Sequence, residues 1–388
     1  KGVGASSAAI TVNNTDGTCT ANITNNLSNR NAIVNGGCLV AQRGTSSASA
    51  DFASVDRMKL SVTNMDQLAW LQKQSDDAPD GFQKSWEFDV TTAENALDAD
   101  DLVYMRYAVE AQDLTPFFNA NGTGKDFILS FYVKAYQTGT YQISIFQLSN
   151  SSRFITKTYT IAQSGVWQRI ELAFTGDTNQ SGFSADNALG FQIAFQLIAG
   201  SNYTSGGQVT NWGGFGNSHF AAGQAVNVGS STDNYWKITG IQLELDQGSG
   251  KATDFEHRSF ADELLKCQRY CQKLGGTDDQ YGCMGVGAGI YNTQAFVPYR
   301  LVPVMRSAPS FTLVGAASNF TYIRDGGFYN PNSLALDAAS KTMMNIAVTV
   351  STGISHDEAI RLWNNSTSGG FLFTCLLYTS DAADDLYR

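Results

Sequence analysis

Aromatic and amide side chains gather in one long segment, Ala199–Asp233, which is rich in glycine and has no regular hydrophobic period. Sugar binding needs an aromatic ring to stack on a pyranose, together with polar groups that bond its hydroxyls. The segment supplies both kinds of group, and we predict that six of its residues bind glycan: Tyr203, Asn211, Trp212, Phe215, Asn217 and His219. The alternative is that these rings cover the edge of the fold or a contact between subunits.

Catalytic chemistry has few candidates in this sequence. The chain holds three histidines, His219, His257 and His356, and no Gly-x-Ser-x-Gly turn. Glycoside hydrolysis uses two carboxylates about 5–10 Å apart, and the sequence distinguishes no such pair. We predict no catalytic residue and a protein that is not an enzyme, with a polysaccharide depolymerase as an alternative. His257, in the stretch FEHR, is interpreted as fixing a joint between a strand and a helix.

Metal binding has weak signals. Cys267 and Cys271 are four residues apart, but a zinc site would need two further ligands, for which His257 and Cys283 are the candidates. We interpret the cysteines as small buried thiols. Calcium prefers six to eight oxygen ligands, and the sequence has no dense acidic loop. No cofactor is therefore predicted, with a calcium ion as the alternative, held by carboxylates near strand ends: Glu87, Glu110, Asp233 and Glu244.

Composition excludes several classes of protein. Of 388 residues, 25 are Lys or Arg and 35 are Asp or Glu, which gives a net charge of −10. That balance, without a run of basic residues, argues against a nucleic-acid partner. No apolar stretch approaches the roughly 20 residues that span a bilayer. An aromatic content of 12% is too high for a disordered chain.

Strands that alternate between apolar and polar residues dominate the middle of the chain. The clearest runs from Leu189 to Leu197, where Gln192 and Gln196 lie between apolar residues. Such alternation is typical of antiparallel strands with one buried and one wet face. We predict an all-β fold, with an extended segment at 1–50 and a jelly-roll-like sandwich at 51–258. The stretch Asp66–Gln74 has a helical pattern.

One helix and a second β unit follow the predicted sandwich. Ser259 is a good N-cap, and Phe260, Leu264, Cys267, Cys271 and Leu274 form one apolar stripe, which predicts a linking helix at 259–274. Residues 275–374 are predicted to be a smaller C-terminal β domain. Residues 375–388 match nothing before them and resemble translated sequencing adapter at the end of a metagenomic contig. We therefore exclude them from the fold, and we expect that the chain before Lys1 is also incomplete.

Three segments together resemble one protein family. Residues 29–45 read NRNAIVNGGCLVAQRGT, and residues 236–245 read WKITGIQLEL, followed by ATDFEHRS at 252–259 and CQRYC at 267–271. Residues 303–309 read PVMRSAP. In this order, the segments are similar to the conserved boxes of tail-fibre and related virion proteins of tailed bacteriophages. The resemblance covers about residues 25–374.

The resemblance implies a structural virion protein that is usually trimeric. It also implies a carbohydrate-binding-like jelly roll joined to a distal β domain that meets the host surface. The expected partners are further copies of the chain, other virion proteins and a host-surface glycan. Three alternatives remain open: a capsid decoration or head fibre without a receptor role, the depolymerase, and a secreted carbohydrate-binding module.

Overall fold

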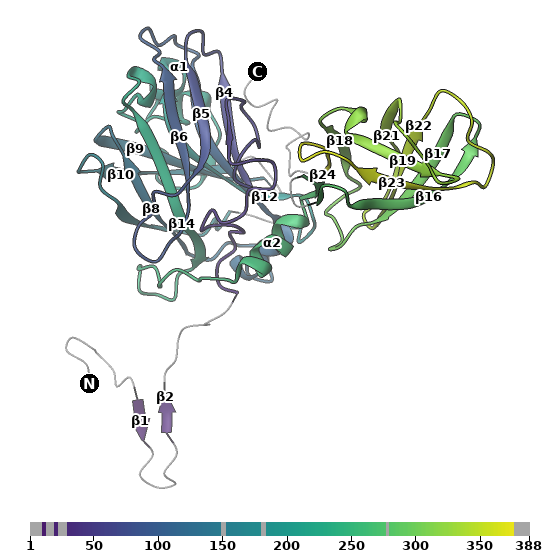
Figure 1. Ribbon diagram of the computed structural model, residues 1–388. Helices are drawn as coiled ribbons and strands as arrows, with labels where there is room; N and C mark the ends of the chain where they lie inside the picture. Colours follow the sequence, from purple (N-terminus) through teal and green to yellow (C-terminus); the bar gives the residue numbers. More distant parts are fainter. Residues whose placement is uncertain are drawn as a thin grey trace.

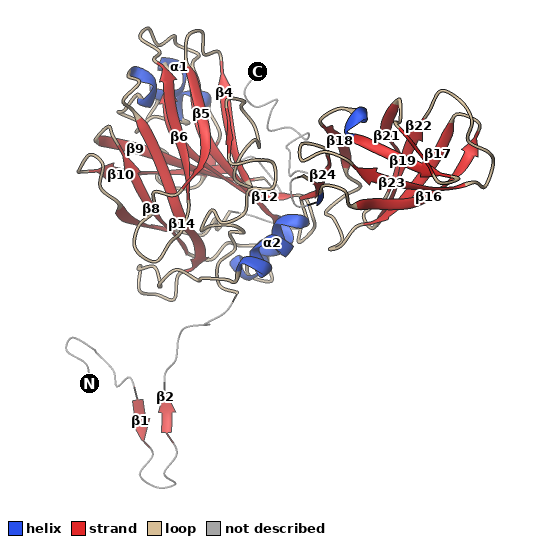
Figure 2. Cartoon of the chain, in the orientation of Figure 1, coloured by secondary structure: helices blue, strands red, loops and turns tan. Residues whose placement is uncertain are grey.

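The fold is all-β, as predicted. A computed structural model describes residues 29–148, 153–179, 184–276 and 279–375, together with the backbone of a short antiparallel pair, β1 (Ile10–Val12) and β2 (Cys19–Ala21). Two β units are joined through one helix (Figures 1 and 2). Within the described residues, no helix is long and apolar enough to cross a membrane.

The larger unit is a sandwich of two six-stranded antiparallel sheets. We name each sheet by one of its central strands. The β12 sheet has the order β13 (Gly213–Gly214), β10 (Arg153–Ile161), β9 (Gly139–Gln147), β12 (Leu189–Ala199), β7 (Leu102–Glu110) and β4 (Met58–Thr63). The β14 sheet has the order β11 (Gln168–Phe174), β8 (Phe127–Ala135), β14 (Tyr235–Leu245), β6 (Ser85–Thr92), β5 (Ala69–Ser75) and β3 (Ser46–Ser47).

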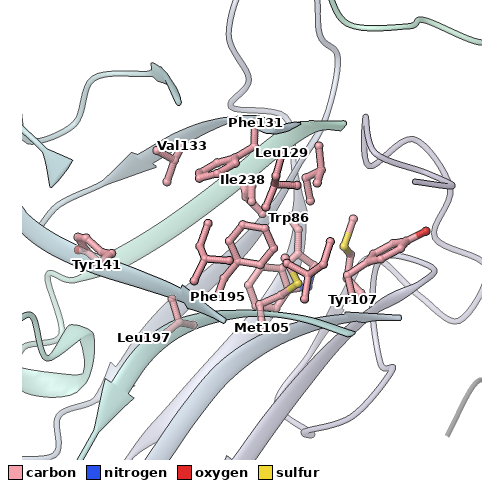
Figure 3. Close-up of a cluster of buried hydrophobic side chains, with 14 of the residues drawn as sticks. Trp86, Met105, Tyr107, Leu129, Phe131, Val133, Tyr141, Phe195, Leu197 and Ile238 are labelled. Atoms are coloured by element: carbon pink, nitrogen blue, oxygen red, sulfur yellow. The ribbon is translucent and has the colours of Figure 1, made fainter. Parts of the chain in front are cut away.

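Alternate residues of the two sheets fill the space between them. Phe131 and Ile238 from the β14 sheet meet Phe195 and Met105 from the β12 sheet (Figure 3). Trp86 and Trp236 are fully buried, with ring centroids 6.1 Å apart at an angle of 71°. Aromatic pairs with this edge-on geometry stabilise a core beyond the area they bury.

The sandwich begins earlier in the chain than predicted. Ile33, Cys38 and Val40 are buried, and β3 pairs with β5, so residues 29–50 belong to the sandwich within the described chain. The helical pattern at Asp66–Gln74 is also wrong. Residues 69–75 form β5, because pairing with β6 satisfies their backbone groups and outweighs the local periodicity.

Helix α2 (Phe260–Gln268) is shorter than predicted. The Ser259 side chain accepts from the Asp262 amide at 3.1 Å, which confirms the N-cap. The helix ends at Gln268 because residues 271–275 pair as β15 with β24. The apolar stripe does not form one buried face: Cys267 is fully buried, whereas Phe260 is 57% exposed.

The C-terminal domain packs a three-stranded sheet on a seven-stranded sheet. The first has the order β15 (Cys271–Gly275), β24 (Gly370–Thr374) and β18 (Ser310–Val314). The second has the order β20 (Gly327–Tyr329), β19 (Phe320–Arg324), β23 (Ala359–Asn364), β16 (Cys283–Tyr291), β17 (Gln294–Arg300), β22 (Met343–Thr349) and β21 (Ser333–Ala339). Of the predicted tail at 375–388, only Cys375 lies in the described residues, and it is buried.

Candidate functional site

The long segment after β12 covers the outer face of the β12 sheet. It carries α1 (Ser201–Thr204) and two single turns, η2 (Asn217–His219) and η3 (Val228–Ser230). The carbonyl oxygen of Phe220 accepts from Gln142 at 2.7 Å, Ser144 at 2.7 Å and Gln196 at 3.1 Å. Gln196 is therefore buried, although alternation predicts that it faces water.

Most of the predicted aromatic platform packs against the sandwich. Tyr203 is 5% exposed and belongs to a cluster with Phe146, Phe154 and Phe220. Phe215 is half-buried, and its ring centroid lies 5.3 Å from that of Phe146. These two rings therefore offer little or no free face to a sugar.

Trp212 and His219 are also engaged by the protein. The Trp212 indole is half-buried and donates to the Thr175 carbonyl at 2.6 Å, while packing beside Phe191. His219 Nδ1 lies 2.7 Å from the Gly207 carbonyl oxygen. The two predicted amides, Asn211 and Asn217, are exposed. The structure therefore does not bring the six residues together as one exposed platform.

Two of the six residues, Tyr203 and Asn217, line one hollow at the end of the sandwich where β4 ends and β7 begins. The hollow has a volume of about 610 Å³ and is lined by Thr63, Asn64, Asp100, Asn202, Tyr203, Asn217 and Ser218. Three separate segments supply these residues: the end of β4, the loop before β7, and the segment that covers the β12 sheet. We call this site the polar hollow.

Hydrogen bonds between the three segments fix the walls of the polar hollow. Asn64 Nδ2 donates to Asp100 Oδ2 at 2.7 Å. The backbone amide of Asn202 donates to the Ala99 carbonyl at 2.9 Å, and that of Gly200 to the Asp101 carbonyl at 2.8 Å. A Cβ on Gly200 would lie 2.1 Å from the Asp98 carbonyl oxygen, so the close approach of these segments requires glycine there.

The chemistry of the polar hollow is that of hydroxyl recognition. Its lining offers amides and hydroxyls, which both donate and accept hydrogen bonds, and one carboxylate, which accepts them. Burial and the nearby Asp100 carboxylate raise the pKa of Tyr203, so its hydroxyl remains protonated at neutral pH. Sequence reasoning missed Thr63, Asn64 and Asp100, because isolated polar residues at the ends of distant strands carry no local signal. It also passed over Asn202 and Ser218, although both lie within the predicted segment.

The residues behind the family resemblance form a structural joint at the opposite end of the sandwich. Glu256 accepts from the backbone amides of Asn29, at 2.6 Å, and Asn31, at 2.8 Å. Arg258 donates to the Ile33 carbonyl at 2.9 Å and pairs with Glu263 at 3.2 Å. We call this arrangement the joint.

Two further expectations, for His257 and for the cysteines, concern residues near the joint. His257 packs its ring 4.9 Å from that of Phe255, and both residues lie between β14 and α2, where His257 was expected. Cys267 and Cys271 are buried, as expected, and burial raises the pKa of the Cys271 thiol to about 12. Cys283 is exposed, so the interpretation as a buried thiol is wrong for that residue. In the described part of the chain, no group of three His, Cys, Asp or Glu residues is placed to hold a metal ion.

Three of the four carboxylates weighed for calcium are paired with basic side chains. Glu87 pairs with Lys237 at 3.2 Å, and Glu110 with Arg269 at 2.9 Å. Glu244 lies 3.5 Å from Arg30, and Asp233 is exposed. The three paired carboxylates are therefore already balanced by basic side chains.

Comparisons with known proteins give distant structural likenesses only. The chain matches no protein-family profile and no curated protein sequence. The enzymatically active domain of bacteriophage CBA120 tailspike protein 4 is 15% identical over 58% of this chain, with a TM-score of 0.31, and the match spans 24% of that structure. The architecture assigned above rests on the strand order of this chain.

Two carbohydrate-binding modules are similarly distant. The family 11 module of the cellulosomal cellulase Lic26A-Cel5E of Clostridium thermocellum is 12% identical over 52% of this chain and 95% of its own, with a TM-score of 0.27. TmCBM61, in complex with beta-1,4-galactotriose, is 11% identical over 56% of this chain and 99% of its own, with a TM-score of 0.25.

Proposed function

We propose that this chain is a structural virion protein of a tailed bacteriophage, a fibre or an appendage, that binds host-surface glycan in the polar hollow. The observation that carries the glycan part is the lining of the hollow. Asn64, Asn202 and Asn217 surround it with exposed amides, and Asp100 adds a carboxylate that one of these amides holds in place. Such groups match the alternating donors and acceptors of sugar hydroxyls.

The joint supports the virion part of the proposal. Two of the three resembling segments, far apart in sequence, contact each other through Asn31, Glu256 and Arg258. The resembling segments therefore contact each other in the fold. Motifs that matched the family separately and by chance would have no reason to do so.

Binding without catalysis fits the polar hollow better than hydrolysis. Glycosidases place two carboxylates on either side of the scissile bond. Asp100 is the one carboxylate among the lining residues, which include no histidine. A binding protein needs no such pair.

A glycan array with the full chain tests the proposal. We expect Asn202→Ala and Asn217→Ala together to weaken binding about tenfold or more, since each removes side-chain hydrogen bonds worth about 1 kcal/mol. Asn211→Ala is the matched control, because Asn211 is exposed on the same segment but does not line the hollow. Absence of glycan binding by the unaltered chain would refute the glycan part, and clearance of capsule in a plaque-halo assay would indicate a depolymerase.

The virion part has its own test. We expect antibodies against this chain to label phage particles, and its mass in solution to be that of a homotrimer. Labelling of the capsid, with no glycan bound, would favour a head fibre or decoration protein. A monomer encoded away from tail and capsid genes would favour a secreted carbohydrate-binding module.

A further inference from the structure

The connections around the polar hollow lack basic side chains. The connections 64–68, 93–101 and 200–234, which surround the hollow, contain no Lys or Arg. The hairpins at 136–138 and 162–167, at the same end of the strands, contain none either. His219 is the one histidine in these five connections, and its ring lies against the Gly207 carbonyl.

Carboxylates are concentrated in the same connections. The six are Asp66, Glu94, Asp98, Asp100, Asp101 and Asp233. Hydrogen bonds join the three segments that carry them: the Gln67 amide donates to Glu94 at 2.9 Å, and the Glu94 amide donates to the Gly229 carbonyl at 2.8 Å. The six carboxylates therefore belong to one face of the molecule, and Asp100 lines the hollow itself.

One of these carboxylates, Asp101, reports the local electrostatic field. Asp101 is 2% exposed, and its Oδ1 has no hydrogen-bond partner within the described residues. Burial raises the pKa of Asp101, and Asp98, Glu94 and Asp100 raise it further. A pKa raised by neighbouring carboxylates indicates that negative charges act on one another across these loops.

We propose that the polar hollow selects glycans without net negative charge, either neutral or amino-sugar chains, and rejects carboxylated ones. The inference rests on the proposed glycan-binding function and names the substrate class of that site. Like charges repel over about 8 Å at physiological salt. The carboxylates that adjoin the hollow therefore repel a negatively charged group bound in it. No basic side chain in the hollow is available to pair with a uronate or sialate. An ammonium group on an amino sugar would instead pair with the Asp100 carboxylate.

Three exposed carboxylates outside the hollow provide a clean test. Asp66, Asp98 and Asp233 are exposed, do not line the hollow, and make no side-chain hydrogen bond or ion pair with the described residues that would be lost on change to Asn. The triple variant D66N/D98N/D233N therefore alters the field without altering the contacts. Asp80, Asp254 and Asp337 are exposed residues outside this face, and D80N/D254N/D337N is the control with the same change in charge.

The experiment compares the full chain and both variants on a glycan array, at low salt and at about 0.15 M salt. For the unaltered chain we expect bound glycans to carry no net negative charge, and binding of amino sugars to weaken as salt rises. The triple variant should raise binding of carboxylated counterparts about threefold or more and leave neutral glycans unchanged. The control variant should leave both unchanged.

The failures of the two proposals are distinguishable. Preferred binding of carboxylated glycans by the unaltered chain would overturn the selectivity while leaving glycan binding intact. An equal response of the two variants would also overturn the selectivity. The net charge of the chain, rather than the carboxylates around the hollow, would then determine binding of carboxylated glycans. If no glycan binds at all, the proposed function fails first, and the selectivity fails with it.

Discussion

At the scale of single residues, a glycine shows how the joint is built. A Cβ on Gly36 would lie 2.2 Å from the carbonyl oxygen of Ile241, whereas one on Gly37 would meet nothing closer than 3.9 Å. The Ile241 amide donates to the Gly36 carbonyl at 3.0 Å, so the two backbones are held together at this point. A side chain at position 36 must push them apart.

Gly36→Ala should therefore destabilise the fold by about 2–4 kcal/mol, the range of forced overpacking with loss of a buried hydrogen bond. Gly37→Ala should change the free energy of unfolding by less than about 1 kcal/mol. Urea unfolding of both variants measures the difference. Equal urea midpoints for the two variants would show that the backbones at the joint shift to accommodate the added methyl group.

Single residues were also where sequence reasoning about the site was weakest. Of the six residues predicted from the composition of the segment, Tyr203 and Asn217 line the polar hollow, and their glycan contact stays a prediction. Asn64 and Asp100 escaped notice, because only the pairing of β4 with β7 brings their loops together. Phe215 and Trp212 were predicted to present their rings to a glycan, because the sequence does not show that the two rings pack on a face of the sheet.

At the scale of elements, one row of side chains crosses the outer face of the β14 sheet. Strand pairing places Lys73 opposite Glu87, Glu87 opposite Lys237, and Lys237 opposite Lys134. Two lysines directly opposite each other repel. Asp77, from the loop after β5, offsets this by accepting from both, at 2.8 Å each, and from the Trp167 indole at 3.0 Å.

This arrangement makes part of the stability depend on pH. Burial raises the pKa of Asp77, but the bonds from Lys134, Lys237 and Trp167 outweigh it and lower the pKa to about 2, from an ordinary 3.8. The stabilisation is therefore present above about pH 4 and is lost as pH falls toward 2. Because Asp77 is about one-third exposed, we expect Asp77→Asn to cost about 1–2 kcal/mol at pH 7 and little at pH 2.

Urea unfolding at several pH values checks this expectation. The matched control is Asp76→Asn, since the Asp76 side chain is 86% exposed and pairs only with Lys84 at the surface. The gap between wild type and Asp77→Asn should close on acidification, whereas the gap for Asp76→Asn should stay small throughout. A gap for Asp77→Asn that does not depend on pH would contradict the assigned role.

The covering segment is the element that the sequence described least well. Alternation located the sandwich strands, because one face of each is apolar. It failed for β5 and for residues 271–274, where pairing with β6 and β24 overrides a helical period. It also assigned Gln196 to water, although this side chain donates to the Phe220 carbonyl under the covering segment.

Trp212→Ala should consequently act on stability rather than on binding alone. Loss of a half-buried indole and its bond to Thr175 is expected to cost about 1–3 kcal/mol. Thermal unfolding measures this cost, and a glycan array on the folded variant separates it from binding. An unchanged unfolding temperature together with lost binding would restore Trp212 to the site.

At the scale of the whole molecule, the two β units are fastened near β15. The backbone amide of Arg306 donates to the Arg269 carbonyl at 2.9 Å, and its guanidinium donates to the Asn187 carbonyl at 3.0 Å. Asn187 returns a bond to the Arg306 carbonyl at 3.0 Å. The resembling segment PVMRSAP thus supplies a contact between the sandwich and the C-terminal domain.

Arg306→Ala removes the guanidinium bond to Asn187 and should weaken the contact between the two units. We expect one calorimetric unfolding transition in the unaltered chain and two resolved transitions in the variant, because a weaker interface no longer makes the units unfold together. Arg300→Ala, at an exposed position on β17, should keep the single transition. Two transitions in the unaltered chain would contradict the coupling.

The joint has a consequence for the order of events during synthesis. Glu256 meets Asn29 and Asn31 across more than two hundred residues, and Glu263 accepts from the Asn35 amide at 2.6 Å. A ribosome must therefore release both β14, which lies between β8 and β6 in its sheet, and the start of α2 before residues 29–35 and the β14 sheet have all their partners. Until then the nascent chain exposes apolar strands, so this protein should depend on chaperones during translation and should lose solubility when truncated before residue 256.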